Sequence, residues 1–333
     1  MRALVFSEPH KMAIEELPQP VAADDQLLIR VRASGICGTD LHIFEGEYTA
    51  QYPLVPGHEF SGEVVETGPH CTRFKVGDRV AVEPNTPCNN CPECLRGQHH
   101  FCRNMVVPGV NRPGGMAEYA VVAERAAFDI GDLPWEEGAL CEPLSCVVRS
   151  IERLDPQIGE RVLVLGAGPI GLLMARLIRA RGVTRIDFLE RNPTRGRRVA
   201  EMRYGEVFGD LGAVPDRAYD SVADASGSSM LVSEAANRLT RSCGKVLAFG
   251  VPAMGRQLAI DHFRLFRDEI SIIASYTSLK NSLQAIDLMR SGLIDVSDIV
   301  SHRIALSQVP TFIERMQAGD GDLRKVTVTD FAG

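Results

Sequence analysis

The chain has 333 residues, of which 45% are hydrophobic and 24% charged, and this length and composition predict a globular protein with two domains. The formal net charge of −7 argues against a nucleic-acid-binding protein, because such proteins usually present a basic surface. No apolar run approaches the roughly 20 residues that a membrane span needs. We therefore expect neither nucleic acid nor membrane as a partner.

The cysteines indicate a reducing compartment. There are nine, an odd number, and the chain opens with MRALVFSEPHK, which predicts a strand and turn rather than a signal peptide. A cytoplasmic protein with metal-binding thiolates and some buried free thiols fits this pattern better than a disulfide framework does. Cys71, Cys146 and Cys243 have no metal-like spacing and are interpreted as packing residues.

The predicted secondary structure changes along the chain. Up to about residue 145, short β-branched runs such as LLIRVRASGIC and DRVAVEP alternate with Gly, Pro and Asp, which predicts a compact all-β fold. From about Gly159, RVLVLG (161–166), PIGLLMARLIRARG (169–182) and RIDFLE (185–190) alternate strand, helix and strand. This alternation predicts a parallel sheet of βαβ units. The segment after about residue 280 does not obviously extend that sheet.

Four cysteines form a C-x2-C-x2-C-x7-C cluster in a loop rich in Pro and Asn: Cys88, Cys91, Cys94 and Cys102. Short C-x2-C loops bring thiolates together without long-range folding, as a tetrahedral zinc site requires. Two disulfides or a redox pair are the alternatives, and they fit poorly with a chain that has no export segment. The spacing predicts a closed structural zinc site, which holds structure and does no chemistry.

Gly166, Gly168 and Gly171 form a G-x-G-x-x-G turn that follows a predicted strand and opens a helix at Pro169 and Ile170. The glycines permit a tight turn and a close approach of the backbone to a pyrophosphate, which then faces the helix N-terminus. A lone match to this pattern is weak, but here the strand, helix and second strand are all in place. The segment predicts a dinucleotide site.

Glu190 ends the second predicted strand about 20 residues later, where an acid takes the ribose hydroxyls of NAD. The arginines that follow could instead neutralise the 2′-phosphate of NADP, or form a solvated helix face: Arg191, Arg195, Arg197 and Arg198. Because Glu190 would repel that phosphate, NAD is favoured over NADP.

Donors for a second metal lie in three further segments, GICGTDLH, VPGHEFSGEVV and GALCEPLSC, which supply Cys37, His58, Glu59 and Glu142. Taken singly, these residues are a core cysteine, a hydrogen-bonded histidine and two surface acids. Together with a nucleotide-binding fold, they form the mixed sulfur, nitrogen and oxygen set of a catalytic zinc with an exchangeable position.

The motifs GICGTDLH, PGHEFSGEVVETG, VGDRVAVEP, CEPLSC and VLVLGAGPIGLL together resemble the signatures of the zinc-dependent medium-chain dehydrogenase/reductase family. The resemblance covers essentially the whole chain. It implies an α/β protein with a GroES-like β-rich catalytic domain (1–145) that contains the zinc lobe (88–102). A Rossmann NAD-binding domain with a doubly wound parallel sheet (146–275) follows, and a return segment (276–333) completes the catalytic domain. A homodimer or homotetramer is expected.

The resemblance also assigns site residues. Cys37 and His58 match the first two catalytic zinc ligands, and Glu59 and Glu142 match the polyol and threonine dehydrogenase branch. In that branch one glutamate coordinates zinc while the other ligates it or holds its water. Asp40 resembles the carboxylate that orients the ligand histidine. Two zinc ions per subunit are therefore expected.

Thr39 and His42 match the family's proton relay of hydroxyl, ribose hydroxyl and imidazole, although a surface histidine without a role is the alternative for His42. The implied reaction is zinc-assisted oxidation of an alcohol, with hydride passing to the nicotinamide. The expected partner is thus a small-molecule alcohol, and the protein is predicted to be an NAD-dependent alcohol or polyol dehydrogenase.

The motifs leave more than one class of alcohol as the substrate. CGTDLHIFEGEY and VSHRIALSQVP look most like sugar-alcohol dehydrogenases, and a cyclitol or a sugar phosphate is also compatible. The sorbitol-type branch, however, has an aromatic residue where Ile43 stands and an Arg-Tyr pair near Thr277 and Ser278. CGTD-x-HI is shared with threonine 3-dehydrogenase, so an amino alcohol is the runner-up. The alternative outside the enzymes is a zinc-stabilised protein that binds a nucleotide and has no catalytic turnover.

Overall fold

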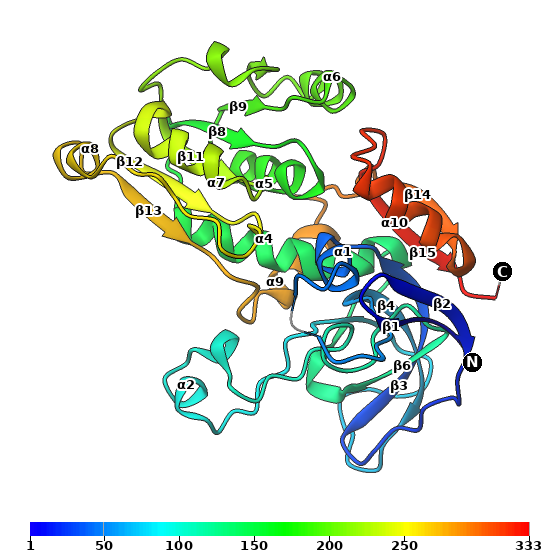
Figure 1. The fold of residues 1–333 in the computed structure, drawn as a ribbon. Coiled ribbons are helices and arrows are strands. Elements are labelled where there is room, and N and C mark those ends of the chain that lie inside the picture. The colour runs from blue at the N-terminus through cyan, green and yellow to red at the C-terminus, as the bar shows by residue number, and fades with distance from the viewer. Residues whose placement is uncertain (49, 333) are drawn as a thin grey trace. The chain divides into compact units, whose positions relative to one another are not determined.

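The computed structural model describes residues 1–48 and 50–332, drawn as a ribbon in Figure 1. The chain divides into two compact units. Unit 1 comprises Met1–Ser145 and Ser278–Gly333, and unit 2 comprises Cys146–Thr277. Unit 1 is rich in antiparallel strands and unit 2 contains a parallel sheet, so the predicted α/β fold class is confirmed. Among the described residues, no helix has both the length and the apolar character that crossing a membrane requires.

Unit 1 is built on a curved sheet in which the C-terminal strands join the N-terminal ones. The strand order is β14-β15-β3-β4-β5-β7, and β6 also pairs with β3. The strands are β3 (Gln26–Gly35), β4 (Glu59–Thr67), β5 (Arg79–Val82), β6 (Tyr119–Ala123), β7 (Ala127–Asp129), β14 (Val300–Ala305) and β15 (Lys325–Asp330). A separate antiparallel pair precedes them, β1 (Arg2–Glu8) and β2 (Lys11–Glu16).

The core of unit 1 explains why the last segment returns to the first. Leu27, Ile29 and Val31 of β3 alternate into one hydrophobic cluster, and Val326 and Val328 of β15 enter the same cluster. Each such side chain contributes about 1.5–3 kcal/mol when fully buried. The two ends of the chain therefore share one core.

The helices of unit 1 are short. They are α1 (Gly38–Phe44), α2 (Pro92–Leu95), α3 (Trp135–Ala139), α9 (Ser282–Arg290) and α10 (Val309–Gln317), with 3-10 turns η1 (His99–Phe101), η2 (Glu124–Ala126) and η5 (Leu306–Gln308). The longer helix α4 (Cys141–Leu154) begins in unit 1 and continues into unit 2. Short helices of this kind connect strands and position side chains at their ends.

Unit 2 is a parallel sheet with strand order β10-β9-β8-β11-β12-β13. Its strands are β8 (Arg161–Leu165), β9 (Arg185–Leu189), β10 (Val207–Phe208), β11 (Tyr219–Asp224), β12 (Thr240–Ala248) and β13 (Ser271–Ala274). Its helices are α5 (Pro169–Ala180), α6 (Pro193–Glu201), α7 (Ser229–Glu234) and α8 (His262–Arg267), with a π-turn η4 (Ala235–Leu239) and a 3-10 turn η3 (Leu211–Ala213). β11 is buried along its whole length, as strands of a parallel sheet covered on both faces are.

Candidate active site

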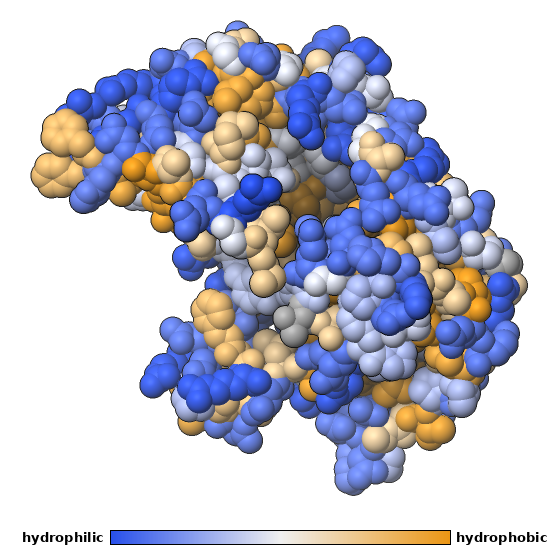
Figure 2. Space-filling view, viewed as in Figure 1, coloured by the Kyte–Doolittle hydropathy of each residue, from blue (hydrophilic) through white to orange (hydrophobic). Residues whose placement is uncertain are grey.

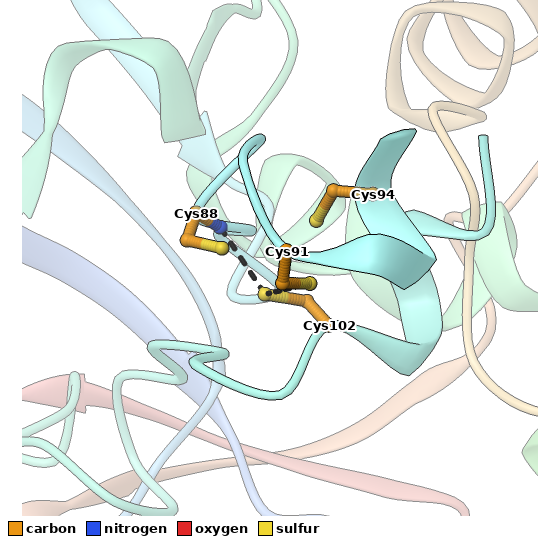
Figure 3. A group of neighbouring side chains, drawn as sticks. All are labelled: Cys88, Cys91, Cys94 and Cys102. Carbon is orange, nitrogen blue, oxygen red and sulfur yellow. Dashed lines mark hydrogen bonds between the residues drawn. The ribbon is translucent and has the colours of Figure 1, made fainter. Parts of the chain in front are cut away.

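The four predicted structural ligands lie together in one lobe of unit 1, as Figure 3 shows. The thiols of Cys88, Cys91, Cys94 and Cys102 are all within 4.8 Å of one another. Cys91 caps α2, Cys94 lies within it, and the backbone N–H of Cys88 donates to the Cys102 sulfur at 3.2 Å. All nine cysteines of the chain carry free thiols, so the cluster is not a disulfide pair.

The surroundings of these thiols shift their pKa values in opposite directions. The backbone N–H of Asn90 is the main cause that lowers the pKa of Cys88 to about 6. Burial, followed by the neighbouring thiols, raises the pKa of Cys94 to about 12. Four thiolates at this spacing repel one another unless a cation lies among them. The donor set therefore fits a closed zinc site, in which metal binding displaces the remaining protons.

A second group of donors lies elsewhere in unit 1. Ligand atoms of Cys37, His58 and Glu59 are also within 4.8 Å of one another. Cys37 is the N-cap of α1, His58 lies in the irregular segment before β4, and Glu59 is the first residue of β4. His58 and Glu59 are buried and Cys37 is half-buried. The structure thus brings together three of the four donors predicted for the catalytic metal.

Asp40 joins the two loops that carry Cys37 and His58. Its Oδ2 accepts from the backbone N–H of Cys37 at 2.8 Å, and its Oδ1 accepts from that of Gly57 at 3.2 Å. Gly57 has φ of +89°, and a Cβ there would lie 2.6 Å from the Met116 side chain. The Asp40 carboxylate lies 3.7 Å from Nδ1 of His58, so it holds the loop rather than bonding the imidazole directly.

The imidazole of His58 provides a test of whether a metal fits. Burial alone would lower its pKa, but the Cys37 sulfur and the Asp40 carboxylate outweigh burial and raise the pKa well above its ordinary value. In the described residues, its buried Nδ1 has no hydrogen-bond partner. A site that favours positive charge on an imidazole also favours a metal cation. The thiol, imidazole and carboxylate therefore fit a zinc ion.

Lys325 is a site residue that the sequence did not reveal. Its ammonium donates to the two oxygens of Glu59 at 2.9 and 2.6 Å and to the carbonyl of Ile36 at 3.1 Å. Burial would lower its pKa, but Glu59 and Cys37 outweigh burial and raise it, so the ammonium stays charged. A lysine that opens a strand, as in KVTVTD, is usually solvated, and no feature of the sequence marks this one as buried.

Glu142 lies in the first turn of α4 and is buried. Among the described residues it is not part of the group formed by Cys37, His58 and Glu59. It is near enough to Lys325 to act electrostatically on the lysine, where it contributes to raising the pKa. Its predicted role as a ligand or as a holder of the metal's water stays a prediction.

The two relay candidates lie on α1. The Thr39 hydroxyl is 3.8 Å from the Cys37 sulfur, and Nδ1 of His42 is 2.8 Å from a carboxylate oxygen of Glu47. The His42 side chain is 29% exposed, so its ring reaches solvent, whereas His58 does not. The contact with Glu47 was not anticipated from the sequence, and the role of His42 as a relay stays a prediction.

The three glycines of the turn in unit 2 differ in backbone conformation and in the space around them. Gly166 has φ of +96°, which strongly favours glycine, and a Cβ at Gly171 would lie 2.0 Å from the carbonyl oxygen of Gly166. Gly168 caps α5, whose first two residues are Pro169 and Ile170. A Cβ at Gly168 would have no neighbour within 4 Å. The protein therefore leaves open space at the helix N-terminus, where a pyrophosphate would fit.

Glu190 follows β9 and faces this turn. One of its oxygens accepts from the backbone N–H of Ala167 and the other from that of Asn192, both at 2.8 Å. The Asn192 side chain in turn caps α6 by accepting from the N–H groups of Thr194 and Arg195. Arg191 is exposed and Arg195 is half-buried. The acid and the arginines are thus adjacent, as their order in the sequence predicts.

At the two positions where the sequence departs from sorbitol-type dehydrogenases, one side chain packs in the core and the other forms a buried hydrogen bond. Ile43 is fully buried in the core of unit 1. The Ser278 hydroxyl donates to the buried carboxylate of Glu83 at 2.6 Å, and Ser282 donates to the same oxygen at 2.8 Å. Ser278 therefore anchors the start of the returning segment to the end of β5.

Residues 23–132 match the family model of the alcohol dehydrogenase GroES-like domain. The chain is 33% identical over 328 residues to D-altritol 5-dehydrogenase of Agrobacterium fabrum, covering 95% of this chain and 96% of that protein. It is 32% identical over 339 residues to L-threonine 3-dehydrogenase of Sinorhizobium medicae, covering 96% of each.

A solved structure is also similar throughout. A zinc-binding dehydrogenase from Sinorhizobium meliloti 1021, bound to NADP, superposes with a TM-score of 0.92 at 32% identity and 98% coverage of both chains. The similarity to this structure therefore extends over residues of both units described above. The chain belongs to the zinc-dependent medium-chain dehydrogenase/reductase family, in its polyol and threonine dehydrogenase branch.

Proposed function

We propose that the protein oxidises a secondary alcohol of a sugar alcohol, or of a related cyclitol or sugar phosphate, to the ketone with NAD. The observation that carries this proposal is the convergence of Cys37, His58 and Glu59 in a chain that also has an open glycine turn. The protein is an oxidoreductase of a family whose named members act on CH–OH groups. The substrate within that class is the proposal.

Two zinc ions per subunit fit the two donor groups. The four cysteines would hold one, and Cys37 and His58 would hold the other, with Glu59 or Glu142 as an additional ligand. The second zinc would supply Lewis-acid polarisation of the substrate oxygen. The nine free thiols agree with a reducing, cytoplasmic compartment.

The protein's own groups would orient the substrate and move its proton. Burial of His58 and Glu59 keeps water away from the reacting oxygen, which strengthens electrostatic interactions there. The Thr39 hydroxyl, beside Cys37, would accept the alcohol proton at Oγ1 while it releases its own proton to a ribose hydroxyl of the cofactor, from which the proton would reach His42. The partly exposed imidazole of His42 would pass that proton to solvent.

For the cofactor, Glu190 supports NAD over NADP. Its carboxylate lies between the glycine turn and the start of α6, where ribose hydroxyls would donate to it and a 2′-phosphate would be repelled. Glu190→Ser should therefore lower the ratio of kcat/KM for NAD to that for NADP by about 10-fold or more. A wild-type protein that prefers NADP, as its NADP-bound structural relative would suggest, would instead assign the phosphate to Arg191 and Arg195.

An amino alcohol is the second candidate substrate, because the relative from Sinorhizobium medicae is an L-threonine 3-dehydrogenase of nearly the same identity as the altritol enzyme. Formation of NADH should be followed with a panel of sugar alcohols, cyclitols, sugar phosphates and L-threonine. Turnover with a polyol supports the proposal, and turnover with threonine alone supports the alternative. No turnover with any alcohol, by a protein that binds NAD and zinc, would favour a sensor or structural protein. Cys37→Ser is the matched control.

A homodimer or homotetramer is proposed for the assembly. Strand β13 lies at one edge of the sheet in unit 2, and exposed apolar side chains belong to the loop before α8 and to α8 itself: Val251, Met254, Phe263 and Phe266. Figure 2 shows apolar residues gathered at the end of unit 2 that carries α8. Exposed patches of this kind mark association surfaces. Sedimentation of the purified protein would test the assembly, and a monomer at all concentrations would contradict it.

A further inference from the structure

Helix α1 ends in a capping motif that holds Glu47 beside His42. The backbone N–H of Glu47 donates to the carbonyl of His42 at 2.8 Å, and that of Gly46 donates to the carbonyl of Ile43 at 3.0 Å. These two bonds form a Schellman motif, with Gly46 in the left-handed conformation at φ of +74°. A contact between two apolar side chains often accompanies this motif, but here the two positions carry a histidine and a glutamate.

The turn between β1 and β2 supports the end of α1. The backbone N–H of His10 donates to the carbonyl of Phe44 at 2.7 Å, and a Cβ at Gly46 would lie 3.1 Å from the ring of Pro9. The His10 ring also packs edge-on against the buried ring of Phe44. The backbone next to Glu47 is therefore fixed by α1 and by this turn, although the Glu47 side chain itself is 49% exposed.

The contact between the two side chains determines which nitrogen of His42 carries a proton. A carboxylate oxygen of Glu47 lies 2.8 Å from Nδ1 of His42. An ionised carboxylate only accepts hydrogen bonds, so Nδ1 is the donor. In a neutral imidazole the other nitrogen, Nε2, then has the free lone pair. Nε2 is therefore the atom of His42 that can take up a proton.

We propose that Glu47 is a positioning residue that holds the Nδ1–H of His42 and so keeps Nε2 as the proton acceptor of the relay. The inference rests on the proposed function, because it requires His42 to receive the proton that leaves the alcohol. The proton binds at Nε2 and gives an imidazolium, which then releases a proton to the solvent that its ring reaches. Without Glu47, the neutral ring could carry its proton on Nε2 and could not accept another there.

Glu45 provides a matched control on the same helix end. Its carboxylate offers an oxygen within 4.8 Å of the corresponding atoms of His42 and Glu47. Its Oε1 accepts from Nε2 of Gln317 on α10 at 2.9 Å, whereas Nδ1 of His42 is bonded to Glu47. Replacement of Glu45 therefore removes the same charge from the same surroundings and leaves the bond to Nδ1 in place.

The first test determines the tautomer of His42 and does not require turnover. The nitrogen chemical shifts of isotope-labelled histidine rings should be compared in wild type, Glu47→Met and Glu45→Met, with His42→Gln used to assign the signals of His42. In the neutral ring, the Nδ1–H tautomer should predominate in wild type and in Glu45→Met. It should become the minor form in Glu47→Met, because methionine offers no oxygen to accept from Nδ1.

The second test is the rate of NADH formation in the first turnover, with the alcohol of highest kcat/KM in the panel above. A positioned base contributes about 10²- to 10⁴-fold, so Glu47→Met should slow this step by about 10-fold or more. Glu45→Met should remain within about threefold of wild type, because exposed charges are screened. Added imidazole should restore the rate of Glu47→Met, since the His42 ring is partly exposed and a small base can replace it. A half-exposed ion pair contributes little to stability, so both variants should unfold like wild type.

Two results would overturn the inference alone. One is a His42 ring whose tautomer is the same in wild type and Glu47→Met. The other is a Glu47→Met protein as fast as wild type, when His42→Gln is slow and is restored by imidazole, because the relay would then operate without Glu47. If His42→Gln were as fast as wild type, or if no alcohol were oxidised, the relay of the proposed function would fail together with the inference.

Discussion

The two donor clusters of unit 1 are assembled in opposite ways. Cys88, Cys91, Cys94 and Cys102 come from one short segment that contributes only to its own small cluster of buried residues. Cys37, His58 and Glu59 come from a helix cap, a loop and a strand, and the main core of the unit holds these elements together. We expect the first cluster to depend on a bound metal for its shape, whereas the second is held by the surrounding strands and loops.

Loss of a catalytic donor should give the largest effect on turnover. Cys37→Ser should lower kcat by more than about 10³-fold, because loss of a direct ligand exceeds the 10- to 100-fold typical of outer-shell partners. The melting temperature should be nearly unchanged, since the loops around Cys37 are held by backbone hydrogen bonds to Asp40. Turnover assays and thermal unfolding check the two parts. A large drop in stability would show that this cluster needs its metal to fold.

The difference between the clusters also explains what the sequence could reveal. Spacing alone predicted the association of Cys88 to Cys102, because their proximity is a property of a short loop. The parallel sheet and the glycine turn were predictable for the same reason, from local strand and helix patterns. The convergence of Cys37 and His58 required the resemblance to a family, because twenty residues of intervening chain separate them.

Lys325 shows the limit of local patterns. It meets Glu59 from the far end of the chain, through strand pairing in which β3 lies between them. The sequence at Lys325 is that of an ordinary strand end, and its partner is defined only by sheet order. Similarly, the Ser278 and Ser282 hydroxyls bond Glu83 across almost two hundred residues. Such pairs depend on the order of strands and returning segments, which composition and periodicity do not determine.

Glu142 should give the next largest effect. It is buried and acts electrostatically on Lys325, although it lies outside the group of Cys37, His58 and Glu59. If it is an alternative ligand or holds the metal's water, Glu142→Ala should lower kcat by about 10²-fold while NAD binding is retained. Steady-state kinetics and NADH fluorescence titration would check this. Near-normal turnover would restrict Glu142 to a structural role in the first turn of α4.

The glycine turn of unit 2 offers a smaller test of a site that is formed before its ligand binds. Gly168 has φ of −73° and open space around its Cα, so Gly168→Ala should fold normally. The added methyl group would occupy the space left for the pyrophosphate and should weaken NAD binding by about 10-fold, or about 1.4 kcal/mol. Gly171→Ala is the contrasting variant, because its Cβ would lie 2.0 Å from the Gly166 carbonyl and should destabilise the unit. If Gly168→Ala and wild type bound NAD with equal affinity, the pyrophosphate would not lie beside Gly168 and the proposed cofactor site would be wrong.

Cys94→Ser should have the smallest effect on turnover and a clear effect on stability, which is the reverse of Cys37→Ser. Cys94 lies in α2 and is buried only among the other three cysteines and their neighbours. Removal of this thiolate should weaken the metal site and destabilise the lobe by more than about 2 kcal/mol. The Cys37, His58 and Glu59 group should be unaffected, because its positions are fixed by β3, β4 and the Asp40 bonds. The protein that remains folded should therefore turn over within about threefold of wild type, since distant sites act independently.

Zinc content, thermal unfolding and kcat of the folded fraction would check this together. A loss of turnover as large as that of Cys37→Ser, in a folded protein, would mean that the two clusters are coupled and that the lobe does more than hold structure.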